Sequence, residues 1–252
     1  MSWTTAPPCV STTNPRWCTI RTAPNGPPGT ACADPGMSEP VTDRPAVAAA
    51  AGLAAAALVL LTILLGGVLV PGYDPSSQYL SELGADGAPH ATLVNLGVFL
   101  PVGALVAVFV LCGWRQLAPT RGGAAGALLL LGVSAGYLIA AVAPCDAGCP
   151  SSGSLRQSVH NAGGLLEYLG GGFGLLLIGR ALLRRPGSQG TALSAVFAAT
   201  AVLGVFFLAL GPQPDSPIRG LWQRVAEFAL FGWIALAAWR MRPGQRPEPS
   251  SE

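Results

Sequence analysis

Hydroxyl and carboxyl side chains gather in the segment PGYDPSSQYLSELGADGAPH, residues 71–90. Asp74 is suited to cap a short helix, on which Gln78, Ser81 and Glu82 would share one face. These residue types carry nucleophilic or metal-assisted chemistry. We interpret the segment as a helix lying against the outer membrane surface, and the alternative is a structured loop with solvated charges. The candidate catalytic residues of this segment are Ser77, Ser81 and Glu82.

A second candidate site lies in SVHNAGGLLEYLGGGFG, where His160 and Glu167 fall on one helical face with several glycines. At 1.5 Å per residue, Glu167 lies about 10 Å deeper than His160. An ionisable side chain at that depth is costly, so it must face the bundle interior or a water-filled cavity. Both residues are candidate catalytic residues. The alternatives are a protonated Glu167 bonded to a neighbouring helix and a His160 bonded to a loop.

The last apolar segment opens with IRGLWQRVAEF, in which Arg224 and Glu227 are three residues apart. An Arg–Glu pair inside the membrane would satisfy both groups. The competing hypothesis is that Arg224 reaches Glu167 or Glu82 and closes an outward-facing polar cavity. Arg224 therefore completes the set of candidate catalytic residues.

Cys145 and Cys149 occur in APCDAGCP, in a connector that we place outside the cell, where disulfides are permitted. We predict a disulfide between them, and the alternative is a metal-binding pair that would need further ligands. Cys112 is interpreted as a small apolar residue. The remaining cysteines have no CxxC spacing, which disfavours a metal site; they are Cys9, Cys18 and Cys32.

The elements that position these residues are predicted to be membrane-spanning helices. Of 252 residues, 51% are hydrophobic and only 10% are charged, against about 25% charged in soluble domains. The long apolar segments show no polar face, which excludes a soluble helical bundle. The fold class is therefore all-α, a polytopic membrane bundle of six transmembrane helices. The predicted spans are 46–70, 92–112, 124–143, 165–183, 192–210 and 221–239.

Arginine placement predicts the orientation of these spans. The second and fourth connectors and the tail are rich in Arg, so both termini are expected to be cytoplasmic and the odd connectors to face outward. The six-helix domain covers 46–240, and 241–252 is a disordered cytoplasmic tail. Residues 1–45 are a disordered or mis-annotated extension, with translation expected to start at Met37. A net charge of +2 gives no reason to expect nucleic acid.

Three motifs, GYDPSSQYLSELGA, SVHNAGG and GLWQR, resemble the six-span bacterial family catalogued as domain of unknown function 998. The similarity covers about residues 46–240, and its first motif is the most specific part. The resemblance implies a six-helix membrane fold and carries no activity. It agrees with the residues above on where a site would lie. We expect a multi-pass protein of the cell membrane, that is, the plasma membrane.

Three functions compete. The leading one is a non-catalytic partner, sensor or ligand-binding membrane protein. The second is a hydrolase or transferase acting on lipid-linked substrates at the outer leaflet, although GxSxG and HExxH motifs are absent and two His exclude a three-His zinc site. The third is a proton- or ion-coupled transporter that uses Glu167. The expected partners are the lipid bilayer and a lipid or lipid-linked ligand, and no nucleotide or haem signature indicates a cofactor.

Overall fold

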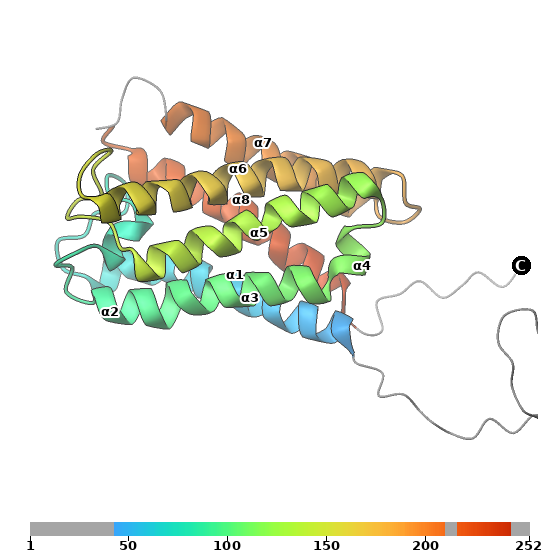
Figure 1. The fold of residues 1–252 in the computed structure, drawn as a ribbon, viewed down its shortest axis with the longest axis horizontal. Helices are drawn as coiled ribbons and strands as arrows, with labels where there is room; N and C mark the ends of the chain where they lie inside the picture. Colours follow the sequence, from blue (N-terminus) through green and yellow to red (C-terminus); the bar gives the residue numbers. More distant parts are fainter. Residues whose placement is uncertain (1–42, 210–215, 243–252) are drawn as a thin grey trace, which may run out of the picture. The chain divides into compact units, whose positions relative to one another are not determined.

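The computed structural model describes residues 43–209 and 216–242 (Figure 1). The predicted start at Met37, all but the first two residues of the predicted C-terminal tail and all but the last three residues of the predicted N-terminal extension lie outside the described residues. Within them the chain is helical and contains no strand. The helices are α1 Arg44–Leu69, η1 Leu80–Gly84, α2 Ala91–Val94, η2 Asn95–Phe99, α3 Leu100–Cys112, α4 Trp114–Leu117, α5 Arg121–Val142, α6 Leu155–Leu183, α7 Gln189–Ala209 and α8 Arg219–Arg240.

Five stretches of helix are long and apolar enough to cross a membrane. They are α1, the continuous stretch α2–η2–α3, α5, α6 and α7. α8 has a similar length, but Gln223, Arg224 and Glu227 lower its hydropathy. The all-helical class is therefore confirmed, together with five candidate spans.

The six long helices form a closed ring of neighbours. Following the contacts, α1 packs on α3, α3 on α5, α5 on α6, α6 on α7, α7 on α8, and α8 returns to α1. Figure 1 shows these helices running side by side, with the short α4 at one end of the bundle. Polar side chains are buried inside this ring, while many large apolar side chains are exposed on its outside, such as Phe197 at 77%.

Glycines set the closest helix contact, between α5 and α6. A Cβ added at Gly132 would overlap the Leu166 carbonyl oxygen, and one at Gly170 would lie 2.5 Å from the Leu129 oxygen. Only residues without a side chain allow backbones to approach this closely. Gly174, four residues further along α6, also packs on α5, since an added Cβ there would lie 2.8 Å from the Gly126 carbonyl oxygen.

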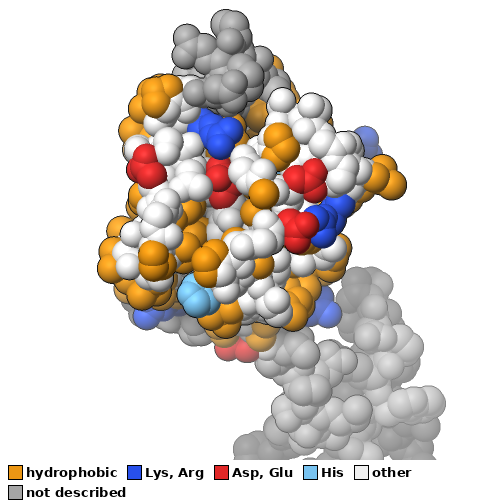
Figure 2. All heavy atoms as spheres, turned by 90° about the vertical axis from the view of Figure 1, so that its left-hand side faces the viewer, with side chains coloured by type: hydrophobic (Ala, Val, Ile, Leu, Met, Phe, Trp, Pro, Cys, Tyr) orange, Lys and Arg blue, Asp and Glu red, His pale blue; other side chains and the backbone are white. Residues whose placement is uncertain are grey.

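The loops that follow α1 and α5 meet the start of α8 at one end of the bundle, which we call the loop end. In Figure 1 it lies at the left, and Figure 2 views the molecule from that side. Acidic and basic side chains gather there among uncharged groups (Figure 2). This concentration of polar groups makes the loop end the place to look for a site.

Candidate functional site

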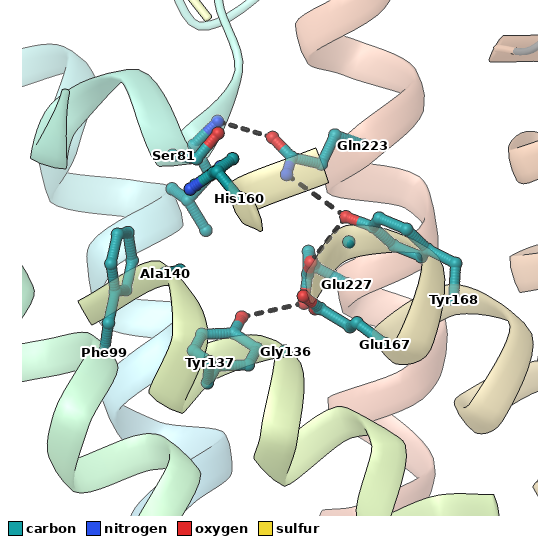
Figure 3. A pocket seen from close by; sticks show the side chains of 12 residues that line it. Ser81, Phe99, Gly136, Tyr137, Ala140, His160, Glu167, Tyr168, Gln223 and Glu227 are labelled. Carbon is teal, nitrogen blue, oxygen red and sulfur yellow. Dashed lines mark hydrogen bonds between the residues drawn. The ribbon is translucent and has the colours of Figure 1, made fainter. Parts of the chain in front are cut away.

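A small cavity opens beneath the loop end, between α5, α6 and α8 (Figure 3). Its volume is about 50 Å³, which is room for a few water molecules. Acidic, phenolic, amide and imidazole groups share its wall with apolar ones. The lining residues are Leu80, Ser81, Phe99, Gly136, Tyr137, Ala140, His160, Gly164, Glu167, Tyr168, Gln223 and Glu227. We call it the acidic cavity.

Two carboxyl groups lie against each other in this cavity. Glu167 comes from α6 and Glu227 from α8, and they are 9% and 1% exposed. Both line the same cavity, and Figure 3 shows their carboxyl groups close together. The Glu167 side chain packs over Gly136 of α5, where an added Cβ would lie 2.7 Å from the Glu167 Cβ. A glycine at position 136 is therefore what lets this carboxyl sit between the helices.

Tyrosine hydroxyls satisfy one member of the pair. Tyr137 donates a hydrogen bond of 3.0 Å to Glu227 Oε2, and Tyr168 donates one of 2.9 Å to Glu227 Oε1. Glu167 is less well satisfied, because its buried Oε1 has no hydrogen-bond partner within the described residues. An acceptor of this kind is costly to bury unless a proton, cation or water meets it.

A chain of hydrogen bonds links the carboxyl pair to the loop end. The Leu80 backbone N–H donates to Gln223 Oε1, and Gln223 Nε2 donates to the Tyr168 hydroxyl over 3.1 Å. Tyr168 in turn donates to Glu227 (Figure 3). Gln223 therefore joins the first residue of η1 to the buried acids.

Arg219 bonds to the loop between α1 and η1, residues 70–79, and to Glu82, on the surface side of the cavity. Its Nε donates to the Ser77 carbonyl over 2.9 Å, and one terminal nitrogen pairs with Glu82 Oε1 at 3.2 Å. Glu82 also accepts from Gln78 Nε2 at 3.0 Å and from the Tyr79 backbone N–H at 2.8 Å. Glu82 is thus engaged in structural bonds on both carboxylate oxygens.

Arg224 does not form the ion pair that the sequence suggested with Glu227, Glu167 or Glu82 among the described residues. Its guanidinium donates to the Gln78 and Gly220 carbonyls, both at 2.9 Å, and to the Tyr73 hydroxyl. The reason is proximity: the loop lies so close to the start of α8 that a Cβ added at Gly220 would overlap the Gln78 oxygen. Arg224 therefore ties the loop to α8.

The interfacial helix predicted from Asp74 onward is instead a turn followed by the short η1. Asp74 does cap the turn, accepting from the Ser77 hydroxyl at 2.6 Å and from the Ser76 hydroxyl and backbone. The Ser77 and Ser76 side-chain bonds, with the Ser76 backbone bond, lower the pKa of Asp74 from 3.8 to about 2. Ser77 is therefore committed to this turn and does not line the cavity.

Cys145 and Cys149 are joined by a disulfide in the loop between α5 and α6, next to His160. The His160 Nδ1 lies 3.0 Å from the Ala143 carbonyl oxygen, so this histidine is bonded to a loop as one alternative held. Ser81 Oγ lies 3.5 Å from Cys149 Sγ. Ser81 and His160 therefore sit at the mouth of the cavity, beside the sulfurs.

The structure brings three of the six candidate catalytic residues to the cavity wall, namely Ser81, His160 and Glu167. Ser77, Glu82 and Arg224 lie outside the cavity wall, where Arg219 and Arg224 hold the loop between α1 and η1 against α8. Sequence reasoning paired Glu227 with Arg224 and did not identify Tyr137, Tyr168 or the bridging role of Gln223. One signal was present, because a deep Glu167 requires polar partners on the facing helices.

Comparisons with known proteins give one match. The model of a family described as "Protein of unknown function (DUF998)" matches residues 53–240. This range contains α5, α6 and α8, and hence the whole acidic cavity. No curated protein and no solved structure matches the chain.

Proposed function

The chain belongs to the DUF998 family, whose description assigns no function, and from its geometry we propose a non-catalytic membrane protein that binds a proton or small monovalent cation in the acidic cavity. The observation that carries this proposal is that the buried carboxyl groups of Glu167 and Glu227 share one small cavity, with Glu167 Oε1 left without a partner among the described residues. This deepens the ligand-binding interpretation of the sequence and shares its key residue with the transport hypothesis.

Charge supports a bound cation. Two carboxylates side by side in a water-poor interior repel each other, and a proton or cation between them removes that repulsion. The tyrosine hydroxyls already supply donors to Glu227, so the group that lacks a partner is an acceptor on Glu167. A positive ligand with no large body fits both the charge and a cavity of about 50 Å³.

The same volume disfavours a lipid-processing enzyme, since a lipid headgroup needs more room than a few waters. Ser81 and His160 share the cavity mouth and are the residues that would serve such a reaction. Glu82 and Arg224, however, are held by Arg219 and by backbone carbonyls. These bonds support a structural role for Glu82 and Arg224, in which they hold the loop against α8, rather than a role in a reaction.

We place this site in a bundle of six spans with both termini in the cytoplasm. α8 supports a sixth span because it fills the gap in the ring between α7 and α1. It also exposes large apolar side chains, including Leu221, Val225 and Phe228, as the other spans do. Its polar residues Arg224 and Glu227 are buried, so they face the protein interior rather than lipid.

The test uses the full chain in lipid nanodiscs. Infrared difference spectra after a pH change would show a protonated-carboxyl band in the parent that Glu167→Gln and Glu227→Gln each remove or shift. Thermal midpoints in sodium, potassium and choline chloride at equal ionic strength would separate a metal cation from a proton, because a ligand that binds the folded state raises the midpoint.

Asp86→Asn is the matched control, since it removes an exposed carboxyl from the same end of the bundle and should leave both readouts unchanged. The proposal fails if the parent shows neither a carboxyl signal nor cation-dependent stability. It also fails if Glu167→Gln folds normally and retains both responses.

A further inference from the structure

Three side chains of types that bind soft metals converge at the mouth of the acidic cavity. One ligand atom each from Cys145, Cys149 and His160 lies within 4.8 Å of the other two. Both cysteines are buried and His160 is half-buried. Two sulfurs and one imidazole nitrogen make up a ligand set that Zn²⁺ prefers.

The surrounding structure holds these ligands in place. Gly148 and Cys149 have φ values of 77° and 44°, so the backbone turns back on itself and brings Cys149 to Cys145. The turn is anchored outside the cluster, because the Asp86 N–H donates to the Cys145 carbonyl at 2.9 Å. Asp146 in the same turn accepts hydrogen bonds from the Ser154 N–H and hydroxyl.

His160 carries the supporting hydrogen bond that is typical of a metal-binding histidine. Its Nδ1 donates to the Ala143 carbonyl at 3.0 Å when the proton is on that nitrogen, which leaves Nε2 as a free base. Ser81 lies beside both sulfurs, with its Oγ 3.5 Å from Cys149 Sγ and its carbonyl oxygen 3.8 Å from Cys145 Sγ. Three protein ligands and one open position are the pattern of a zinc site that is not fully closed.

We propose that the reduced form of this chain binds one Zn²⁺ through Cys145, Cys149 and His160. The disulfide and the metal exclude each other, since each sulfur bonds either to the other sulfur or to the ion. A two-electron reductant such as a dithiol or phosphine first converts the disulfide to two thiols. Zn²⁺ then replaces the two thiol protons, which are released to water.

Two thiolates on a tetrahedral zinc lie about 3.7 Å apart, against about 2.05 Å in a disulfide. The change is small enough for side-chain rotation within the anchored turn. This site is separate from the Glu167–Glu227 pair, so the inference does not depend on the proposed function. In this proposal, the redox state of Cys145 and Cys149 decides whether the loop between α5 and α6 holds a metal.

The experiment uses the full chain with the other four cysteines replaced, Cys9→Ser, Cys18→Ser, Cys32→Ser and Cys112→Ser. The protein is reduced with a phosphine, freed of reductant under argon and titrated with Co²⁺, a spectroscopic substitute for Zn²⁺. We expect one Co²⁺ per chain, a thiolate-to-cobalt charge-transfer band with tetrahedral ligand-field bands, and displacement of the cobalt by Zn²⁺. The oxidised protein should give none of these signals.

Cys145→Ser and Cys149→Ser should each abolish the charge-transfer spectrum or reduce it to weak binding. His160→Ala keeps the disulfide for folding and should lower affinity for Zn²⁺ at least tenfold after reduction. The matched control is His90→Ala, which removes the other histidine of the chain and should bind as the parent does. A reduced parent with two free thiols and no cobalt spectrum overturns the proposal, as does a spectrum that survives Cys145→Ser.

Discussion

Two ion pairs at the loop end show why burial, and not distance, decides what a charged residue contributes. Arg156 and Asp86 lie 2.7 Å apart, but their side chains are 40% and 65% exposed. Arg219 and Glu82 lie 3.2 Å apart with exposures of 22% and 5%. Water screens the first pair and is largely excluded from Glu82, so the longer contact matters more for stability.

We therefore expect Glu82→Gln to lower the free energy of unfolding by about 1–3 kcal/mol, because Arg219 loses its charge partner and the Tyr79 N–H its carboxylate. Arg156→Gln is the control and should change it little. The measurement is the thermal midpoint of the detergent-purified full chain. Equal losses in the two variants would contradict the argument from burial.

Asp74 gives a prediction for acid stability. Its folded pKa of about 2 is below 3.8, so its carboxylate stabilises the fold above about pH 4. That contribution is lost as pH falls from about 4 toward 2, where the carboxyl becomes protonated. Asp74→Asn should therefore lose less stability than the parent between pH 5 and pH 2, as read from thermal midpoints at about half-unit steps. Parallel curves for the two proteins would count against this.

The site could be predicted from sequence only in part, and particular residues show why. Glu167 stood out because an acid deep in an apolar helix must have a polar partner. Its partner Glu227 was visible in sequence but was assigned to Arg224, three residues away. Helical spacing identifies residues that share a face, whereas the rotation of α8 toward α5 and α6 is set by packing. Tyr168 was missed for the same reason.

At the scale of the element, the close glycine contact between α5 and α6 predicts that two glycines of α6 differ in how much stability they lose on substitution. Gly170→Ala places a Cβ 2.5 Å from the Leu129 carbonyl oxygen, so the two helices must separate. We expect a loss of about 1–3 kcal/mol of stability, or failure to fold. Gly164→Ala, on the same helix, meets nothing within 4 Å and should be tolerated.

Fluorescence-detected size-exclusion chromatography after a heat step would compare these two variants with the parent. A Gly164→Ala protein that aggregates at the same temperature as Gly170→Ala would contradict the argument, because the contact of Gly170 with α5 would then make no difference. Because both changes make the same chemical substitution in one helix, their difference isolates the contact with α5.

The bounds of the helices were predictable to a few residues, with one exception. Apolar content identified α1, α5 and α7 closely, but α6 begins at Leu155, ten residues before the predicted 165. Hydropathy marks where a helix meets lipid, while its true start is a cap. Here the Ser154 hydroxyl accepts from the Gln157 N–H at 3.1 Å. The additional turns carry His160, which is why the loop end includes this residue.

At the scale of the whole molecule, the proposed six spans would place the two ends of the bundle in different compartments. In a background lacking the four cysteines outside the disulfide, Asp86→Cys and Arg185→Cys place single thiols in exposed positions at the first and fourth connectors. We expect an impermeant maleimide to label Asp86→Cys in intact cells and Arg185→Cys only after permeabilisation. Labelling of both from outside would contradict the proposed topology.

The loop between α1 and η1, residues 70–79, packs closely against the start of α8. A Cβ added at Gly220 would overlap the Gln78 carbonyl oxygen and would lie 2.6 Å from that of Pro75. The loop and the start of α8 are therefore in direct backbone contact at this point. A larger residue at position 220 would push the loop away from α8 and disturb the ring where α8 meets α1.

The hydrogen bonds from Leu80 through Gln223 and Tyr168 to Glu227 all donate in one direction, from the surface loop toward the buried acid. A backbone N–H can only donate, so Leu80 fixes the orientation of the Gln223 amide, and that amide leaves the Tyr168 proton free only for Glu227. Aligned in this way, the dipoles of the chain add, and their positive ends favour negative charge on Glu227. The Leu80 backbone thus fixes the donor direction of every hydrogen bond in this chain, down to Glu227 in the core. If the pair binds one proton, as we propose, we expect it on Glu167, because Glu227 accepts hydrogen bonds on both oxygens while Glu167 Oε1 has no partner among the described residues.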